Sequence, residues 1–205
     1  MLVALDEMYI EWRRKMRSLH DAQRSAVPLY ERTTTFRIYQ PHLIPGLLQT
    51  PAYAEALLHG VATFRDLSDH DLAEAVSTRM ARQQVLKQAG RRFAVLLEES
   101  ALYYSPCDAD SMAGQLGHLM AVATLPSVSL GIIRQDLTER RRRPVEGFWI
   151  FDDNIVQVEL VSGFLSLRQP HEVSEYAAAF EEFADLAYRG ATARASITAA
   201  IDALA

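Results

Sequence analysis

The chain has 205 residues, of which 49% are hydrophobic and 23% are charged, and its formal net charge at pH 7 is −5. This composition is ordinary for a globular domain, and the negative charge argues against nonspecific binding to nucleic-acid phosphates, which requires dense Lys and Arg. The single cysteine, Cys107, excludes an internal disulfide framework and a cysteine-cluster zinc site. No apolar run reaches the ~20 residues that span a bilayer, and no signal-peptide pattern is present, so we expect a cytoplasmic protein without membrane contact.

The first predicted element is a long amphipathic helix over residues 3–30. Its apolar residues recur at three- and four-residue spacing, while most of its arginines fall elsewhere. A basic helix of this kind can contact DNA, a membrane surface or an acidic partner, but packing on its own domain or on a second subunit is favoured. We therefore expect residues 1–32 to form a connector and packing helix, and residues 33–205 to form the main domain.

The segment over residues 37–58 is the most tightly specified part of the chain. Pro41 and Pro45 cannot lie inside a helix or a central strand. Thr50 is suited to cap a helix whose first position is Pro51. The segment predicts a strand, an irregular turn and a helix, and such a turn can either position a ligand or simply connect two core elements.

Later periodic segments predict the remaining elements. Strands are expected at 92–97, 128–133, 147–151, 155–160 and 164–167, and helices at 68–88, 111–123, 170–188 and 191–204. Asp152-Asp153-Asn154 predicts a hairpin turn, and the arginine run 140–143 predicts an exposed loop with solvated charge. Together these elements indicate an α+β or α/β fold with a mixed sheet of about five strands packed by several helices.

The residues Pro45-Gly46-Leu47-Leu48-Gln49-Thr50, followed by Tyr53-Ala54, resemble the signature of the DUF5753 family. The resemblance continues through Trp12-Arg13-Arg14, Leu29-Tyr30-Glu31, Arg79-Met80-Ala81-Arg82-Gln83, Leu86, Glu98 or Glu99, Ala101-Leu102 and Gln115-Leu116. It implies the C-terminal domain of actinobacterial transcriptional regulators of the Scr1-type, antitoxin-like, XRE class. In such regulators a helix-turn-helix module comes first, and this chain starts where that module would already have ended.

Candidate catalytic residues are few, and no dinucleotide, phosphate-loop or serine-hydrolase motif is present. Glu98 and Glu99 end a predicted strand, where a partly buried glutamate would have a raised pKa and could act as a general acid or base. The alternative role is a buried ion pair with Arg79 or Arg82, or capping of the next helical turn. Tyr104 is a further candidate for proton transfer. The six histidines are scattered, so we expect neither a metal nor a cofactor.

Aromatic and polar residues support a small-molecule pocket better than a reaction. Arg79 and Arg82 could anchor a carboxylate ligand through bidentate contacts, or form salt bridges with residues such as Glu74 or Glu98. The predicted ligand-binding set is Gln49, Tyr53, Arg79, Arg82, Glu98, Tyr103, Gln115 and Trp149. The aromatic residues could equally be ordinary core.

Two functions of different classes follow. The favoured one is a regulatory domain that senses a small-molecule ligand or binds a small protein partner, as a homodimer, with DNA reached only through a module absent from this chain. The alternative is a stand-alone, cofactor-free enzyme that cyclises or isomerises a small metabolite by acid–base catalysis. Turnover of the ligand separates the two.

Overall fold

The computed structural model describes residues 9–11, 19–66, 68–138, 140–161 and 163–204. The strands are β1 (Tyr9–Glu11), β2 (Thr35–Gln40), β3 (Arg92–Glu98), β4 (Val128–Ile133), β5 (Phe148–Phe151), β6 (Ile155–Glu159) and β7 (Gly163–Leu167). The α-helices are α3 (Leu19–Arg32), α4 (Pro51–Arg65), α5 (Asp69–Arg82), α6 (Ser100–Tyr103), α7 (Ala109–Val122), α8 (Pro170–Leu186) and α9 (Gly190–Asp202). Short 3-10 helices occupy Gly46–Leu48 (η1) and Gln83–Lys87 (η2).

All these strands belong to one mixed sheet, in the order β1-β7-β6-β5-β2-β3-β4. Strands β2, β3 and β4 are parallel, and the α4–α5 and α6–α7 segments supply the crossovers between them. Every other pair of neighbouring strands is antiparallel. The α/β fold class is confirmed, and the sheet extends to seven strands within the described part of the chain, compared with the five or so expected.

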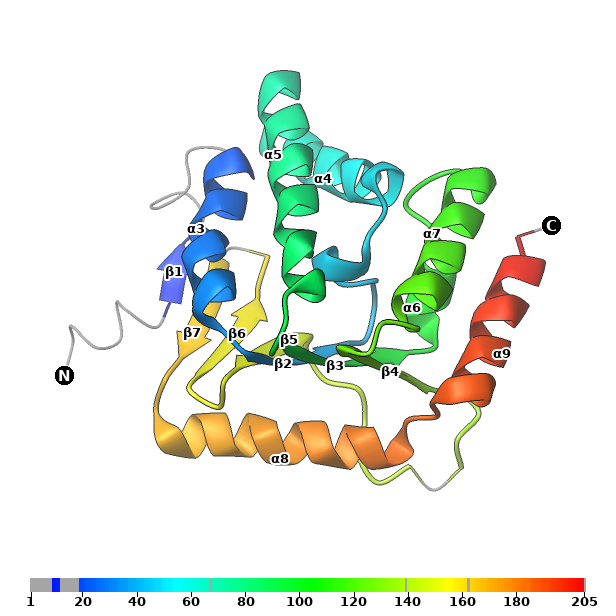
Figure 1. Ribbon diagram of the computed structural model, residues 1–205. Helices are drawn as coiled ribbons and strands as arrows, with labels where there is room; N and C mark the ends of the chain where they lie inside the picture. The colour runs from blue at the N-terminus through cyan, green and yellow to red at the C-terminus, as the bar shows by residue number, and fades with distance from the viewer. Residues whose placement is uncertain (1–8, 12–18, 67, 139, 162, 205) are drawn as a thin grey trace.

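The sheet separates two hydrophobic cores (Figure 1). On the side of α3, α5, α7 and α9, Phe36 stacks on Phe93 with ring centroids 4.6 Å apart. On the side of α8, Tyr39 stacks on Phe183 at 4.0 Å. Because successive side chains of a strand point to opposite faces, Ile38 and Tyr39 of β2 enter different cores.

The N-terminal helix is present as α3, but its predicted extent changes. Residues 9–11 form strand β1, whose Ile10 lies opposite Phe164 of β7, so the prediction of helix there is wrong. Backbone pairing with an open sheet edge has overridden a helical side-chain pattern at these residues. The predicted helical residues 3–8 and 12–18 lie outside the described part. Leu29 and Tyr30 of α3 belong to the same core as Phe36 and Ile38 of β2, and the domain division at residue 32 stays a prediction.

Two local predictions are confirmed. Thr50 caps α4, since its side chain accepts a hydrogen bond from the Tyr53 N–H at 3.4 Å, and Pro51 takes the first helical position. Asp152 and Asp153 form the turn between β5 and β6 with φ of 48° and 56°, a left-handed conformation that Asp tolerates better than most residues. The Asp152 carboxylate also accepts a hydrogen bond from the Thr35 N–H at 2.7 Å, which ties this turn to β2. None of the described helices is long and apolar enough to cross a membrane.

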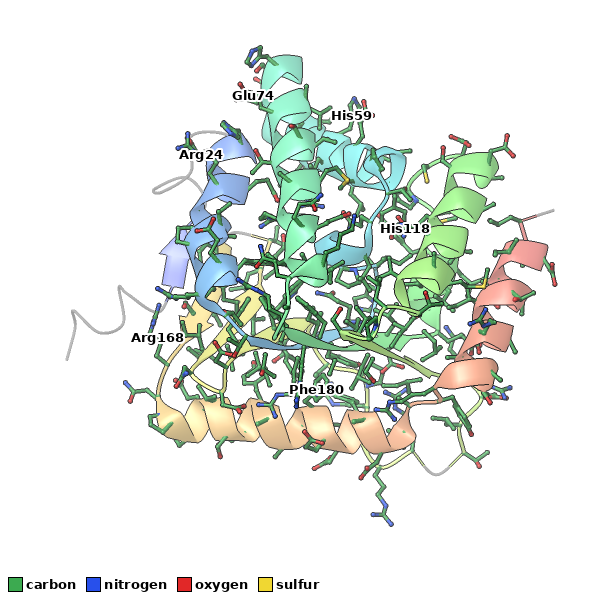
Figure 2. All side chains as sticks on the ribbon, in the orientation of Figure 1. Arg24, His59, Glu74, His118, Arg168 and Phe180 are labelled. Carbon is green, nitrogen blue, oxygen red and sulfur yellow. The ribbon has the colours of Figure 1, made fainter. Side chains whose placement is uncertain are left out.

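His118 on α7 gives a pH-dependent contribution to stability. Its Nε2 is buried without a hydrogen-bond partner among the described residues, and burial lowers the pKa of His118 below 6.5 (Figure 2). The unfolded chain therefore binds a proton more readily, so this residue supports folding above about pH 6.5 and loses that contribution as pH falls through its folded pKa. Urea unfolding between about pH 7.5 and 5.5 should show a smaller acid loss in a His118→Leu variant than in the wild type. Equal losses would contradict this role of His118.

Candidate functional site

The carboxyl ends of the parallel strands β2, β3 and β4 meet at one edge of the sheet. Ligands of open α/β sheets commonly bind outside such an edge, because the loops that leave the strands there diverge. In this chain the edge carries a wide hollow of about 770 Å³ that is open to solvent. We call it the edge hollow, and its lining consists of His42, Glu99, Ser100, Tyr103, Tyr104 and Gln135.

Hydrogen bonds between the loops fix the walls of the edge hollow. Ser100 Oγ donates to the Pro41 carbonyl at 2.7 Å, which joins the segment after β3 to the segment after β2. Glu99 Oε2 accepts from the Gln135 N–H at 2.9 Å, which joins the ends of β3 and β4. Tyr103 and Tyr104 are 50% and 48% exposed, so both rings remain accessible. The result is a pre-formed concavity that combines a few polar groups with two accessible aromatic rings.

Glu98 does not line the edge hollow. It lies on the α8 side of the sheet, like Leu96 two residues earlier, and is only 3% exposed. Its carboxylate makes a bidentate ion pair with Arg140, including an Nη1–Oε2 contact of 2.8 Å, and accepts a hydrogen bond from the Tyr39 hydroxyl at 2.7 Å. The predicted pairing of Glu98 with Arg79 or Arg82 is therefore wrong, because strand alternation directs Glu98 away from them.

Glu98, Arg140 and Tyr39 form a hydrogen-bonded network that fixes Arg140, and with it the segment between β4 and β5, to the end of β3. Burial, followed by the hydrogen bond to Glu98, raises the pKa of Tyr39 well above 10, so its hydroxyl stays a donor. The hydrogen bonds to Glu98 also raise the pKa of Arg140. Since these bonds already occupy both carboxylate oxygens, they favour a structural role, and catalysis by Glu98 stays a prediction.

The arginine run 140–143 is not simply an exposed loop. Arg140 is 16% exposed and enters the protein to reach Glu98, while Arg142 Nε contacts Glu182 Oε2 of α8 at 2.6 Å. Nearby, Tyr176 of α8 donates to Glu146 Oε1 at 2.6 Å. These contacts hold the segment between β4 and β5 against Glu98 and α8. The prediction of solvated charge is thus wrong for Arg140, whose carboxylate partner lies 42 positions away in the sequence.

Hydrogen bonds join the residues of the segment that resembles the family signature. We call residues 44–50 the signature turn. Gln49 Nε2 donates to the Ile44 carbonyl at 2.6 Å, and the Tyr53 hydroxyl accepts from the Ile44 N–H at 3.3 Å. The fully buried Gln115 of α7 accepts from the Thr50 N–H at 2.6 Å and donates to the Leu48 carbonyl at 2.8 Å. Three predicted ligand-binding residues are therefore brought together around this turn, and none of them is part of the lining of the edge hollow.

Arg79 and Arg82, which we call the arginine pair, contact amides. Arg79 Nη1 donates to Gln49 Oε1 at 2.8 Å, and Arg79 Nε donates to Gln23 Oε1 at 3.3 Å. Arg82 Nη2 donates to the same Gln23 oxygen. The predicted salt bridge of Arg79 with Glu74 is wrong, because Glu74 faces the histidines of α3 and α5 instead.

Trp149 also lies outside the edge hollow. It projects from β5 into an aromatic cluster, with its ring 5.7 Å from Tyr30 and 6.1 Å from Phe151. The Arg82 guanidinium lies 5.0 Å from the Tyr30 ring centroid. Trp149 is thus linked through Tyr30 to the arginine pair.

The structure sorts the predicted site residues into separate groups. Glu99, Tyr103 and Tyr104 line the edge hollow. In contrast, Gln49, Tyr53, Gln115 and Arg79 surround the signature turn, and Arg82 contacts Gln23 and Tyr30. Sequence reasoning missed Gln23 and three residues of the hollow, which are His42, Ser100 and Gln135. Each of these three follows the last residue of its strand by two positions, and closeness to a strand end is the signal that could have found them. Within the described residues, no three His, Cys, Asp or Glu side chains are grouped to hold a metal ion.

Solved structures with partial similarity to this chain include an archaeal chromatin protein, TrmBL2, with a TM-score of 0.44 and 11% identity over 85% of this chain. The chain covers 52% of the TrmBL2 chain, about half its length. The phospholipase D family member Nuc from Salmonella typhimurium has a TM-score of 0.43 and 10% identity, over 82% of this chain and 91% of its own. NucT from Helicobacter pylori has a TM-score of 0.44 and 12% identity, over 84% of this chain and 92% of the NucT chain.

No curated protein matches the sequence. The family model described as "Domain of unknown function (DUF5753)" matches residues 23–199, which run from α3 into α9 and include the signature turn, the arginine pair and the edge hollow. The match confirms the resemblance in the sequence. The chain belongs to the DUF5753 family.

Proposed function

We propose that this chain is a regulatory domain that binds a small-molecule ligand in the edge hollow. The observation that carries the proposal is the hollow itself, a pre-formed concavity at the carboxyl ends of three parallel strands. Its lining combines the accessible rings of Tyr103 and Tyr104 with the polar groups of His42, Glu99 and Gln135. Sites for small molecules typically combine aromatic surface with a few directed polar groups in this way.

The hydrogen bonds of Glu98 and Glu99 favour a ligand-binding function over a catalytic one. A general base needs a carboxylate that can reach its substrate and accept a proton. Glu98 is buried against Arg140 and Tyr39 on the other side of the sheet, and Glu99 is engaged with the Gln135 backbone. The cofactor-free enzyme considered from the sequence therefore has weaker support than a ligand-binding domain.

The regulatory part of the proposal rests on the resemblance to actinobacterial transcriptional regulators. A ligand in the edge hollow could bias an attached module only if it binds two conformations of the domain with different affinity. We place the protein in the cytoplasm, as a homodimer or with a small protein partner, and we assign any DNA contact to a module outside this chain.

Equilibrium dialysis against a small-molecule extract of actinobacterial cells tests ligand binding in the edge hollow. Chromatography coupled to mass spectrometry should find a compound enriched with the wild type and recovered with unchanged mass and retention time, because an isomerised product could share its mass. A Tyr103→Ser/Tyr104→Ser variant should lose about tenfold or more of this enrichment, because it removes both accessible rings of the hollow. Phe64→Ser removes an exposed ring from α4 and should leave the enrichment unchanged.

Two outcomes would reject the proposal. Equal enrichment by the double tyrosine variant would place the ligand elsewhere. Conversion of the compound to a product of different mass or structure would instead support the enzyme.

A further inference from the structure

Among the described residues, the arginine pair consists of two cations without an acidic partner in contact. Arg79 and Arg82 are three positions apart on α5, so they lie on the same side of the helix. Both donate to one oxygen of Gln23, and Arg79 also donates to Gln49. In the described part of the chain, no Asp or Glu oxygen lies within 4.0 Å of either guanidinium.

The described surroundings offset little of this positive charge. Burial, and next the charge of Arg82, lower the pKa of Arg79 from 12.5 to about 10, and the opposing effect of Glu159 is smaller. Arg82 Nε is buried and has no hydrogen-bond partner among the described residues. Buried charges in proteins are usually paired with an opposite charge, and amide oxygens carry only partial charge. The cluster therefore has both excess charge and an unused donor.

The arginine pair is packed between α3, the signature turn and the ring of Tyr30. The pair lies where α5 packs against α3, which Figure 1 shows side by side above the sheet. The aliphatic part of Arg79 packs on the signature turn, since a Cβ added at Gly46 would lie 3.6 Å from Arg79 Cδ. Tyr30 provides a ring beneath Arg82. As whole residues, Arg79 and Arg82 are intermediate in exposure, so the cluster is not sealed from solvent.

We propose that the arginine pair binds a small dianionic oxyanion, either a phosphate group or a dicarboxylate. Guanidinium groups bind both chemistries through parallel N–H···O bonds, and two adjacent guanidiniums match a double negative charge. The anion replaces the amide oxygens of Gln23 and Gln49 as the acceptor. This site shares no residue with the lining of the edge hollow and goes beyond the proposed function.

Binding there changes two contacts at once. Gln23 belongs to α3, and Gln49 holds the signature turn through its bond to Ile44. When the arginine pair no longer donates to Gln23 and Gln49, α3 and the signature turn lose these hydrogen bonds to α5. The site therefore offers a route by which an anion changes the attachment of the N-terminal helix.

The wild-type protein provides the first test. The arginine Nε–Hε resonances are followed by NMR during titration with sodium phosphate or sodium malonate, and sodium chloride at matched ionic strength is the control. The Arg82 resonance should shift saturably with phosphate or malonate, at about millimolar concentration, and not with chloride. Tighter binding of phosphate identifies a phosphate group as the ligand, and tighter binding of malonate identifies a dicarboxylate. An Arg82 resonance unmoved by about 50 mM of either anion overturns the proposal.

Matched variants provide the second test. Arg82→Gln should weaken binding of the better anion about tenfold or more, because it removes one guanidinium. Arg24→Gln removes an equal charge from the exposed side of α3 and should bind like the wild type (Figure 2). Equal weakening by the two variants would show a general charge effect and overturn the site. The Tyr103→Ser/Tyr104→Ser protein should retain anion binding, so failure of the edge-hollow proposal is distinguishable from failure of this one.

Discussion

Replacing Arg140 by methionine is expected to lower the free energy of unfolding by about 3 kcal/mol or more, because it leaves the Glu98 carboxylate buried without its cation. Glu98 is 3% exposed, and Tyr39 would be its remaining side-chain donor among the described residues. Urea denaturation at neutral pH, followed by circular dichroism, measures this loss.

A second and a third variant show whether the loss comes from the unpaired charge. Glu98→Met/Arg140→Met removes both charges together, so it should recover much of the stability that Arg140→Met loses. Arg142→Met changes an arginine of the same run whose partner Glu182 is solvent-exposed, and it should have little effect. Similar losses for Arg140→Met and Arg142→Met would mean that the buried pair is not the anchor of this segment.

Replacing Gln115 by leucine should have a comparably large effect on the signature turn. The substitution leaves the Thr50 N–H and the Leu48 carbonyl without their hydrogen-bond partner. Each such group costs about 1–3 kcal/mol when buried, so the expected loss in unfolding free energy for the two groups is about 2–6 kcal/mol. The same denaturation experiment measures it.

Two further glutamine variants calibrate this effect. Gln115→Glu keeps an acceptor for Thr50 but loses the donor to Leu48, so its loss should exceed about 1 kcal/mol. Gln84→Leu makes the leucine change at an exposed glutamine of η2 and should stay within about 0.5 kcal/mol of the wild type. If Gln115→Leu were as mild as Gln84→Leu, the two bonds of Gln115 would contribute little.

The parts of the fold that sequence predicts are those set by local physics. Alternation along residues 155–159 gives a strand whose Val156 and Val158 enter one core, and the structure has β6 there. Thr50 before Pro51 fixes the start of α4, because the hydroxyl satisfies an otherwise unpaired N–H. These signals need no information from distant residues.

The missed features depend on contacts between distant segments. No periodic pattern connects Arg140 to Glu98, because the loop between β4 and β5 decides where the guanidinium lies. Strand β1 depends on the free edge of β7, and Gln23 gives no sequence signal that it contacts two arginines. The end of the predicted strand was enough to suggest Glu99 as a residue of the edge hollow. To exclude Glu98 from the hollow, one must know which face of β3 its side chain occupies.

The position of β2 in the sheet has a consequence for how the chain folds as it is made. Phe36 lies opposite Phe93 on one side and opposite Phe151 on the other, so β2 has one unpaired edge until residues 148–151 have left the ribosome. Pairing across such long sequence separations is slow, whereas the β5–β6–β7 meander is local and forms quickly. The meander is therefore the piece that docks last onto β2, and a nascent chain that stalls before it exposes an apolar strand to chaperones or to other chains.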